Sequence, residues 1–199
     1  MNRVFTLSAI ALAISVFSAS ARIINVPSDY PTIQMGIDSA GTGDTVLVAP
    51  GTYDENLHFR GLDIVLASRF IIDRDDSLIA NTTINGRQSG CVIRLDSGET
   101  VATVIEGFTI RDGHGNYGAG INCTGSSPII RNNMITNNRA YYCGGGIVCR
   151  SGASPQILSN VISFNRADQD MFSNGGGIAL FGSSAVIKNN LIIGNSADL

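Results

Sequence analysis

Hydrophobic and polar positions repeat in one order along the second half of the chain. Three stretches each begin Gly-x-Gly-Ile, continue as a short apolar strand, pass a Gly/Ser turn and end in Ile-x-x-Asn-x-Ile-x-x-Asn: 118–138, 144–165 and 175–195. Such self-similarity at a period in the twenties or thirties is typical of a stacked solenoid. Because each coil returns to the same side, the pattern predicts an all-β parallel β-helix with an interior of stacked Ile, Val and Leu columns.

The first half of the chain carries weaker signals of the same architecture. Strands are expected over 46–48, 64–66, 83–85, 92–95 and 104–106. The successive anchors Ile64, Ile84 and Ile105 are spaced by about one short coil, which predicts that they occupy equivalent positions.

A short helix is expected at the N-terminal end of the solenoid, over residues 28–40. Ile33, Ile37 and Ala40 recur at helical spacing, and Pro31 suits a first helical turn. A solenoid must cover its first apolar coil, and a terminal helix is a usual cover. The segment is therefore predicted to be a capping helix.

Asparagines fall at two repeated positions of the coils. One set is Asn133, Asn160 and Asn190, and the other is Asn138, Asn165 and Asn195. Asparagine tolerates left-handed backbone and can bond to turn amides, and stacked amides can bond to one another as a ladder. The alternative is that these side chains bind sugar. Their period matches the coil, which favours the structural ladder.

The cysteines follow the repeat as well. Cys123 and Cys149 each lie two residues after a repeated isoleucine, at the offset occupied by Leu95 and Leu180 in other coils. Side chains two apart on a strand share a face, so these four should form one inward column of small apolar groups. A Cys123–Cys149 disulfide between neighbouring coils is the alternative. Cys91 is expected to point inward and Cys143 to lie in a loop, and the sequence offers no partner for either.

The first residues have the composition of an export signal. Arg3 gives a positive start, 7–17 is a short apolar run, and Ala19-Ser20-Ala21 is a small-x-small cleavage site. A signal peptide is therefore predicted over 1–21 and a β-helix domain over 22–199, with an uncleaved anchor as the alternative. No later stretch approaches a membrane-spanning length. The protein is expected to be secreted or on the cell surface, which would permit disulfides.

Charge restricts the expected partners. Without Arg3 the chain carries 12 basic and 16 acidic residues, a net charge of −4, and no basic stripe. Nucleic acid needs clustered cations, so it is not an expected partner. The chain stops just after its last repeat, with no polar coil or helix to cover it. Solenoids need terminal caps, so the domain is expected to be C-terminally incomplete, with a missing C-terminal domain as a possible neighbour.

Together, these features resemble the right-handed parallel β-helix proteins of the pectin-lyase-like superfamily. The segment 30–57 (YPTIQMGIDSAGTGDTVLVAPGTYDENL) looks like the entry segment of secreted members, with Gly36 where alanine is commoner, and 105–113 looks like a parallel β-helix repeat. The resemblance implies a right-handed coil. It leaves the activity open, because the superfamily includes pectate lyases, polygalacturonases, pectin esterases, adhesins and phage tailspikes, and a shared fold does not transfer a function.

No complete catalytic motif accompanies the fold. Gly113-His114-Gly115 looks like part of the polygalacturonase motif set, but the Asn-Thr-Asp and Arg-Ile-Lys motifs are absent and the only Asp-Asp pair, Asp75-Asp76, lies well before the repeats. A calcium-assisted lyase would need carboxylates such as Asp96, Glu99, Glu106 and Asp112 beside an arginine. Glu106 and Arg131 share a repeat position, so they are expected to form a surface ion pair. The motifs of pectin esterases are absent.

Surface binding is the remaining class. Loops of variable length are expected to project at 111–118, 139–144 and 166–175, and tyrosines in such loops stack well on sugar rings. The alternative is that they only cover the edge of the solenoid. The candidate ligand-binding residues are Asp112, His114, Tyr117, Arg131, Tyr141 and Tyr142.

The sequence thus predicts an exported β-helix domain that binds polysaccharide or another cell-surface ligand, with no catalytic residue assigned. A polysaccharide lyase or glycoside hydrolase with a divergent or missing centre is one alternative, and a structural stalk or adhesin segment is the other. No cofactor or metal site is predicted, although calcium is possible.

Overall fold

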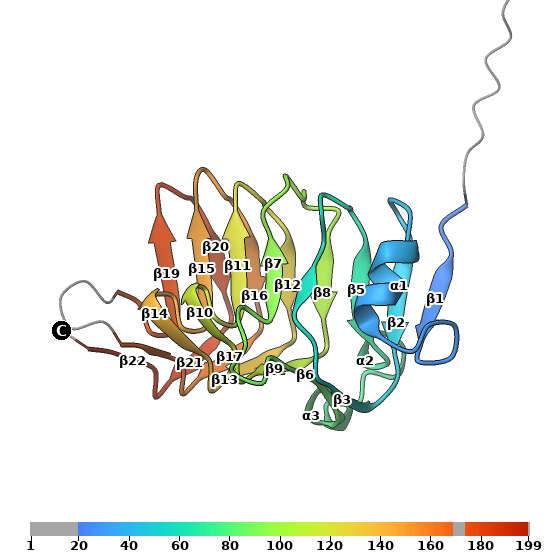
Figure 1. The fold of residues 1–199 in the computed structure, drawn as a ribbon, viewed down its shortest axis with the longest axis horizontal. Coiled ribbons are helices and arrows are strands. Elements are labelled where there is room, and N and C mark those ends of the chain that lie inside the picture. The colour runs from blue at the N-terminus through green and yellow to red at the C-terminus, as the bar shows by residue number, and fades with distance from the viewer. Residues whose placement is uncertain (1–19, 169–173, 199) are drawn as a thin grey trace, which may run out of the picture.

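The chain forms a parallel β-helix whose strands stack into sheets along the long axis of the molecule, as Figure 1 shows. The structure is a computed structural model and describes residues 20–168 and 174–198. All pairings between its strands are parallel, with neighbours contributed by successive coils. The predicted architecture is confirmed. The signal peptide predicted over 1–21 falls almost wholly outside the described residues.

Four sheets make up the coil. The seven-stranded sheet runs β1 (Ile23–Val26), β2 (Thr45–Val48), β5 (Val65–Ser68), β8 (Val104–Glu106), β12 (Ile129–Arg131), β16 (Gln156–Leu158) and β20 (Val186–Lys188). The six-stranded sheet runs β3 (Gly51–Tyr53), β6 (Thr82–Asn85), β9 (Thr109–Arg111), β13 (Met134–Thr136), β17 (Val161–Ser163) and β21 (Leu191–Ile193). The five-stranded sheet runs β4 (Leu57–His58), β7 (Ile93–Leu95), β11 (Ile121–Thr124), β15 (Ile147–Arg150) and β19 (Ile178–Phe181). The four-stranded sheet runs β10 (His114–Tyr117), β14 (Arg139–Cys143), β18 (Arg166–Ala167) and β22 (Ser196–Ala197).

Repeated isoleucines form the core in the register that the sequence pattern predicts. Ile130 lies between Ile105 and Ile157 in the seven-stranded sheet, and all three are fully buried. Ile187 continues this column but is 42% exposed, because it belongs to the last coil that the structure describes. Burial of each such side chain contributes about 1.5–3 kcal/mol, so the stacked columns hold the coils together.

The helix at the N-terminal end is shorter than expected. α1 spans Ile33–Ser39, and the hydroxyl of Thr32 caps it by accepting from the Met35 N–H. Pro31 therefore precedes the helix instead of lying in its first turn. The Glu55 carboxylate accepts from the N–H groups of residues 33 and 34. These hydrogen bonds attach the segment after β3 to the first turn of α1. α1 packs on β1 and β2, as a cap would.

The packing of α1 on the first coil leaves little room for a side chain at residue 36, which is glycine. A Cβ at Gly36 would lie 3.0 Å from Val26 Cγ2 and 3.1 Å from Val46 Cγ1. The departure from alanine noted in the sequence thus lets α1 approach the first coil closely.

Arg22 and Asp44 tie the beginning of β1 to the loop before β2. The Arg22 backbone N–H donates to Asp44 Oδ1 at 2.9 Å, and its guanidinium Nε donates to Oδ2 at 2.7 Å. The hydrogen bond from the guanidinium, together with those from the Gly41 and Arg22 N–H groups, lowers the pKa of Asp44 to about 2. No helix in the described ranges is long and apolar enough to cross a membrane.

Two short helices are inserted in the chain between β5 and β6, so this early coil is longer than the sequence pattern predicted. Ile84 follows α2 (Phe70–Asp73) and α3 (Ser77–Asn81) and pairs with Ile110 in the six-stranded sheet. The residue that pairs with Ile105 is Leu66. The expected equivalence of Ile64, Ile84 and Ile105 is therefore wrong, because the two helices lengthen one coil.

Two ladders of asparagine close the corners of the coils. The side-chain oxygen of Asn160 accepts from the backbone N–H and the side-chain amide of Asn133, and Asn190 does the same for Asn160. Asn138, Asn165 and Asn195 repeat this geometry at the next corner. The ladders extend to two earlier residues without asparagine: the N–H of Phe108 donates to Asn133 and that of Gly113 donates to Asn138.

The glycine-rich coil starts let neighbouring backbones approach one another. Gly144 has a φ of 66°, a left-handed conformation that other residues adopt at a cost. A Cβ on Gly146 would lie 2.5 Å from the carbonyl oxygen of Gly177 in the next coil. Glycine at these positions is thus required both by backbone conformation and by the spacing of coils.

The segments expected to be projecting loops form a sheet. Residues 111–118 contain β10, residues 139–144 contain β14, and 166–175 begins with β18. These strands pair with one another in parallel, so the loop prediction is wrong for them. Residues 169–173 lie outside the described part of the chain. The expected placement of Cys143 in a loop is wrong for the same reason, because it ends β14.

Candidate functional site

An irregularity in the four-stranded sheet brings two tyrosines together. Gly115 pairs with Ala140 and Tyr117 with Cys143, so β14 holds one residue more than β10 between these pairs. Such a bulge re-aims a side chain. The Tyr142 ring stacks on Tyr117 with centroids 5.1 Å apart and planes at 23°, and Tyr141 meets Tyr142 edge-on at 4.9 Å. The three tyrosines predicted as ligand-binding residues thus form one cluster.

The cluster rests on the outer face of the five-stranded sheet. Tyr142 packs against Cys143, Val148 and Ala179, and the last two are register neighbours on β15 and β19. Asn122 is buried on this face and donates from its side chain to the Tyr117 carbonyl. The rigid coil therefore fixes the positions of the rings.

Arg150 completes the site from β15. Its guanidinium carbon lies 4.8 Å from the Tyr117 ring centroid, a cation–π contact that leaves Tyr117 held between Arg150 and Tyr142. Arg150 Nε donates to Thr124 Oγ1 at 2.8 Å, and that hydroxyl donates to Asn122. A hydrogen-bonded chain thus orients the guanidinium.

Tyr117, Tyr142 and Arg150 line a cavity of about 490 Å³, in the size range of small-ligand sites, whereas Tyr141 lies outside its lining. Phe181, 39% exposed on β19, adds a further aromatic surface, and Ser151 and Asn174 add polar groups. Arg150 is the charged residue of the lining. Every other arginine in the ranges that the structure describes is paired with a carboxylate, whereas none is found beside Arg150 there. The site therefore offers a positive group to an incoming ligand.

Asp112 and His114, also predicted as ligand-binding residues, line a different cavity. That cavity has a volume of about 380 Å³ and is shared with Arg139, Arg166 and Phe164. Asp112 Oδ2 lies 2.6 Å from Arg111, and Arg139 and Arg166 both contact Asp168. Its arginines and Asp112 are thus already paired. Asp76, from the Asp-Asp pair, lines a third cavity, so the partial polygalacturonase-like motifs do not meet.

Arg131 lies apart from both cavities; its expected ion pair with Glu106 forms, but it is not a surface pair. Glu106, its partner in register, is fully buried. Arg131 Nη2 lies 2.7 Å and Arg74 Nη1 2.8 Å from the carboxylate, and the Asn132 amide also donates to it. The physical reason is the α2–α3 insertion, which carries Arg74 over a position that the repeat alone would leave open.

The thiols do not form a reactive centre. Cys123 and Cys149 are register neighbours between Leu95 and Leu180, in the predicted column, and both are fully buried free thiols. A hydrogen bond with Cys149 and burial raise the pKa of Cys123, and burial raises the pKa of Cys91 to about 12. The thiolate is the nucleophile, so these groups are poorly suited to covalent catalysis.

Metal ligands are likewise not gathered. Within residues 20–168 and 174–198, no group of three or more His, Cys, Asp or Glu side chains could hold a metal ion. The buried carboxylate of Glu99 accepts from the N–H groups of Gly61 and Ser97 and from the Ser126 hydroxyl, so it serves the packing of loops.

Sequence reasoning missed Arg150, Phe181 and Arg74. A signal existed for the first two, because the repeat that aligns the cysteines also aligns Thr124, Arg150 and Phe181 as the next residues of β11, β15 and β19. No repeat signal marked Arg74, since it lies in an insertion.

Comparison with known proteins agrees with this geometry. Residues 66–198 match the family model described as the right-handed β-helix region. Neither the curated proteins nor the solved structures include a match to the chain. The match covers most of the chain, indicates that the coil is right-handed and fits the resemblance to pectin-lyase-like proteins. The chain belongs to the right-handed β-helix family.

Proposed function

We propose that the protein binds a saccharide at the tyrosine cavity and does not transform it. The observation that carries this proposal is the aromatic wall of Tyr117, Tyr142 and Phe181 around a cavity whose one charged lining residue, Arg150, has no carboxylate partner among the described residues. Aromatic faces and edges pack against the C–H surfaces of sugar rings, and a guanidinium bonds to hydroxyl or carboxylate oxygens.

The rigidity of the wall supports a binding role. Tyr117 is fixed between Tyr142 and Arg150, and Arg150 is fixed by Thr124. Pre-ordered side chains lose little conformational entropy when a ligand arrives, so more of the contact energy becomes affinity. The positive group further favours a sugar that carries an acidic substituent over a neutral one.

Binding and turnover can be measured in one experiment. The purified chain is incubated with neutral and acidic polysaccharides, with and without calcium, while binding is followed by affinity electrophoresis and chain cleavage by the release of new chain ends. We expect retardation by an acidic polysaccharide without cleavage. Cleavage would favour the lyase or hydrolase alternative, and the absence of both would favour the stalk.

Variants place the binding on the cavity. Tyr142→Ala is expected to weaken binding about tenfold, because the ring that orders Tyr117 is lost. Arg150→Gln is expected to reduce binding of acidic ligands more than of neutral ones. Phe164→Ala removes an exposed aromatic ring from the Asp112 and His114 cavity and serves as the matched control. An equal loss in all three variants would place the binding elsewhere.

A further inference from the structure

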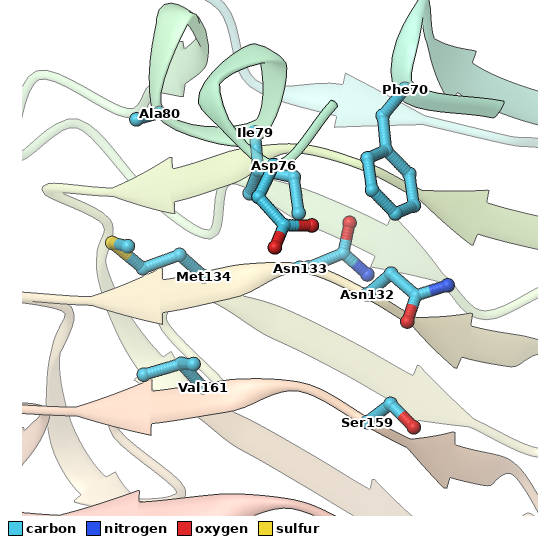
Figure 2. Close-up of a pocket in the computed structure, with 9 residues that line it drawn as sticks. All are labelled: Phe70, Asp76, Ile79, Ala80, Asn132, Asn133, Met134, Ser159 and Val161. Carbon is cyan, nitrogen blue, oxygen red and sulfur yellow. The ribbon is translucent and has the colours of Figure 1, made fainter. Parts of the chain in front are cut away.

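The α2–α3 insertion forms an overhang on the outer face of the six-stranded sheet. The hydroxyl of Thr109 on β9 donates to the Ile79 carbonyl of α3 at 2.8 Å, which fixes the helix over the early strands. On the next two strands, β13 and β17, Met134 and Val161 are only half-buried. A cavity of about 310 Å³ lies between the overhang and these strands, and Figure 2 shows its lining.

The floor and roof of this cavity are apolar. Met134 and Val161, register neighbours on β13 and β17, form the floor, and Ile79 and Phe70 approach from the insertion. Phe70 is nearly buried, and the guanidinium carbon of Arg74 lies over its ring, 5.4 Å from the ring centroid. The cavity can therefore receive an aliphatic stem of a few carbons.

The polar groups of the cavity act chiefly as acceptors. The carboxylate of Asp76 points from the overhang toward the segment that carries Asn132 and Met134 (Figure 2). Within the described residues it has neither a hydrogen bond nor an ion pair, unlike Asp75, which accepts from Ser77. The Asn132 side-chain nitrogen donates to Glu106 at 2.9 Å, so its carbonyl oxygen remains for a ligand.

No positive charge lines the cavity to balance Asp76. The two neighbouring arginines, Arg74 and Arg131, are both held by the buried Glu106 carboxylate at 2.8 and 2.7 Å. A buried carboxylate keeps its partners because leaving it unpaired is costly. The lining thus offers an exposed carboxylate without a cationic partner among the described residues.

We propose that the cavity binds an alkylammonium group, such as that of a lysine side chain or a free aliphatic amine. The ammonium donates to the Asp76 carboxylate and the Asn132 carbonyl, while its methylene stem lies on Phe70, Ile79, Met134 and Val161. An ammonium has three donors and no acceptor, which matches the free acceptors of Asp76 and Asn132 beside an apolar floor. This site differs in sign from the tyrosine cavity and does not depend on the function proposed there.

The test uses n-butylammonium as the probe and the methionine methyl groups as reporters. In the full chain labelled with ¹³C at the methionine methyls, we expect a saturable shift of Met134 on titration, while Met35 on α1 stays unchanged. Sodium pentanoate, with the same butyl stem and the opposite charge, should leave Met134 unmoved. A Met134 response to pentanoate equal to that with butylammonium, or no response to either, would overturn the proposal.

A pair of charge-matched variants separates the cavity from general electrostatics. Asp76→Asn is expected to weaken butylammonium binding about fivefold, the loss typical of one partly exposed ion pair. Asp73→Asn removes the same charge from the same insertion, but Asp73 pairs with Arg69 and lies outside the lining, so affinity should hold. Unchanged remaining methyl signals show that each variant is folded. Equal weakening in both variants contradicts the proposal.

One further titration distinguishes the two sources of the cation. N-acetyl-lysine N-methylamide presents the same ammonium on a peptide backbone. Binding at least as tight as that of butylammonium indicates a lysine of a partner protein, and weaker binding indicates a free amine. Either result supports the cation site.

Discussion

At the scale of single residues, surroundings decide what each polar side chain does. Asn133 and Asn160 satisfy backbone groups of adjacent coils, whereas Asn132, one position earlier, binds a carboxylate. Arg131 is held by Glu106, whereas Arg150 is stacked on a ring and keeps no carboxylate partner among the described residues. Residue type alone would not separate these roles, but register and local pairing do.

Removal of one ladder amide should destabilise the coil. Asn160→Ala leaves the buried Asn133 N–H without its acceptor and the Ile130 carbonyl without the Asn160 donor. Each unsatisfied buried group costs roughly 1–3 kcal/mol, so we expect the free energy of unfolding to fall by about 2–4 kcal/mol. Urea denaturation measures this change. Asn116→Ala, an exposed residue outside the ladders, is the control, and equal stability of the two variants would refute the ladder's role.

Acid should weaken the attachment between Arg22 and Asp44. The pKa of Asp44 is lowered to about 2 from an ordinary value of 3.8 by the Arg22 guanidinium and two N–H donors. A lowered pKa contributes stability above the unfolded value, and this contribution is lost as the pH falls from about 4 through 2. The urea midpoint of the wild type should therefore drop more steeply over this interval than that of Asp44→Asn. Parallel curves would contradict the expectation.

At the scale of elements, the sequence was most informative where one residue type recurs once per coil. The isoleucine, asparagine and cysteine columns could be predicted because stacking repeats each environment. The four-stranded sheet could not, since β10 (HGNY) and β14 (RAYYC) lack an alternating apolar pattern: β10 stays largely exposed, and Cys143 of β14 is buried by packing on another sheet. The burial of Glu106 depends on an insertion about thirty residues earlier, which no periodic signal marks.

Close stacking of coil starts should make one glycine intolerant of a methyl group. In Gly146→Ala the new Cβ would lie 2.5 Å from the Gly177 carbonyl oxygen, so the coils must separate locally. Overpacking of this kind typically costs about 1–3 kcal/mol. In thermal unfolding, the melting temperature should fall clearly for Gly146→Ala. It should hardly change for Gly41→Ala, whose Cβ would meet no atom closer than 3.8 Å. Similar melting temperatures would rule out contact between coils as the constraint.

At the scale of the whole molecule, the two ends of the solenoid differ. α1 packs on the first strands at the N-terminal end (Figure 1), whereas the last described coil exposes apolar side chains at the other end. The exposed set is Leu180, Val186, Ile187, Leu191, Ile192 and Ile193. The edges of β19, β20 and β21 are open there as well, and open edges of this kind favour association.

The purified domain of residues 22–199 should therefore self-associate as its concentration rises. Ile192→Lys places a charge among the exposed apolar groups and is expected to shift sedimentation toward the monomer. Val101→Lys adds the same charge at a residue that is equally exposed but outside this set, so it should not. Monomeric sedimentation of the unaltered chain at high concentration would contradict the prediction.

The contact between Arg22 and Asp44 has a consequence for processing. Cleavage after Ala21, the predicted site, would convert the Arg22 backbone amide into a free α-ammonium at the point where it already donates to Asp44. The new α-ammonium group would lie beside the Asp44 carboxylate, and removal of the signal peptide would stabilise the fold by adding an ion pair there. In this way maturation itself would lock the first strand in place.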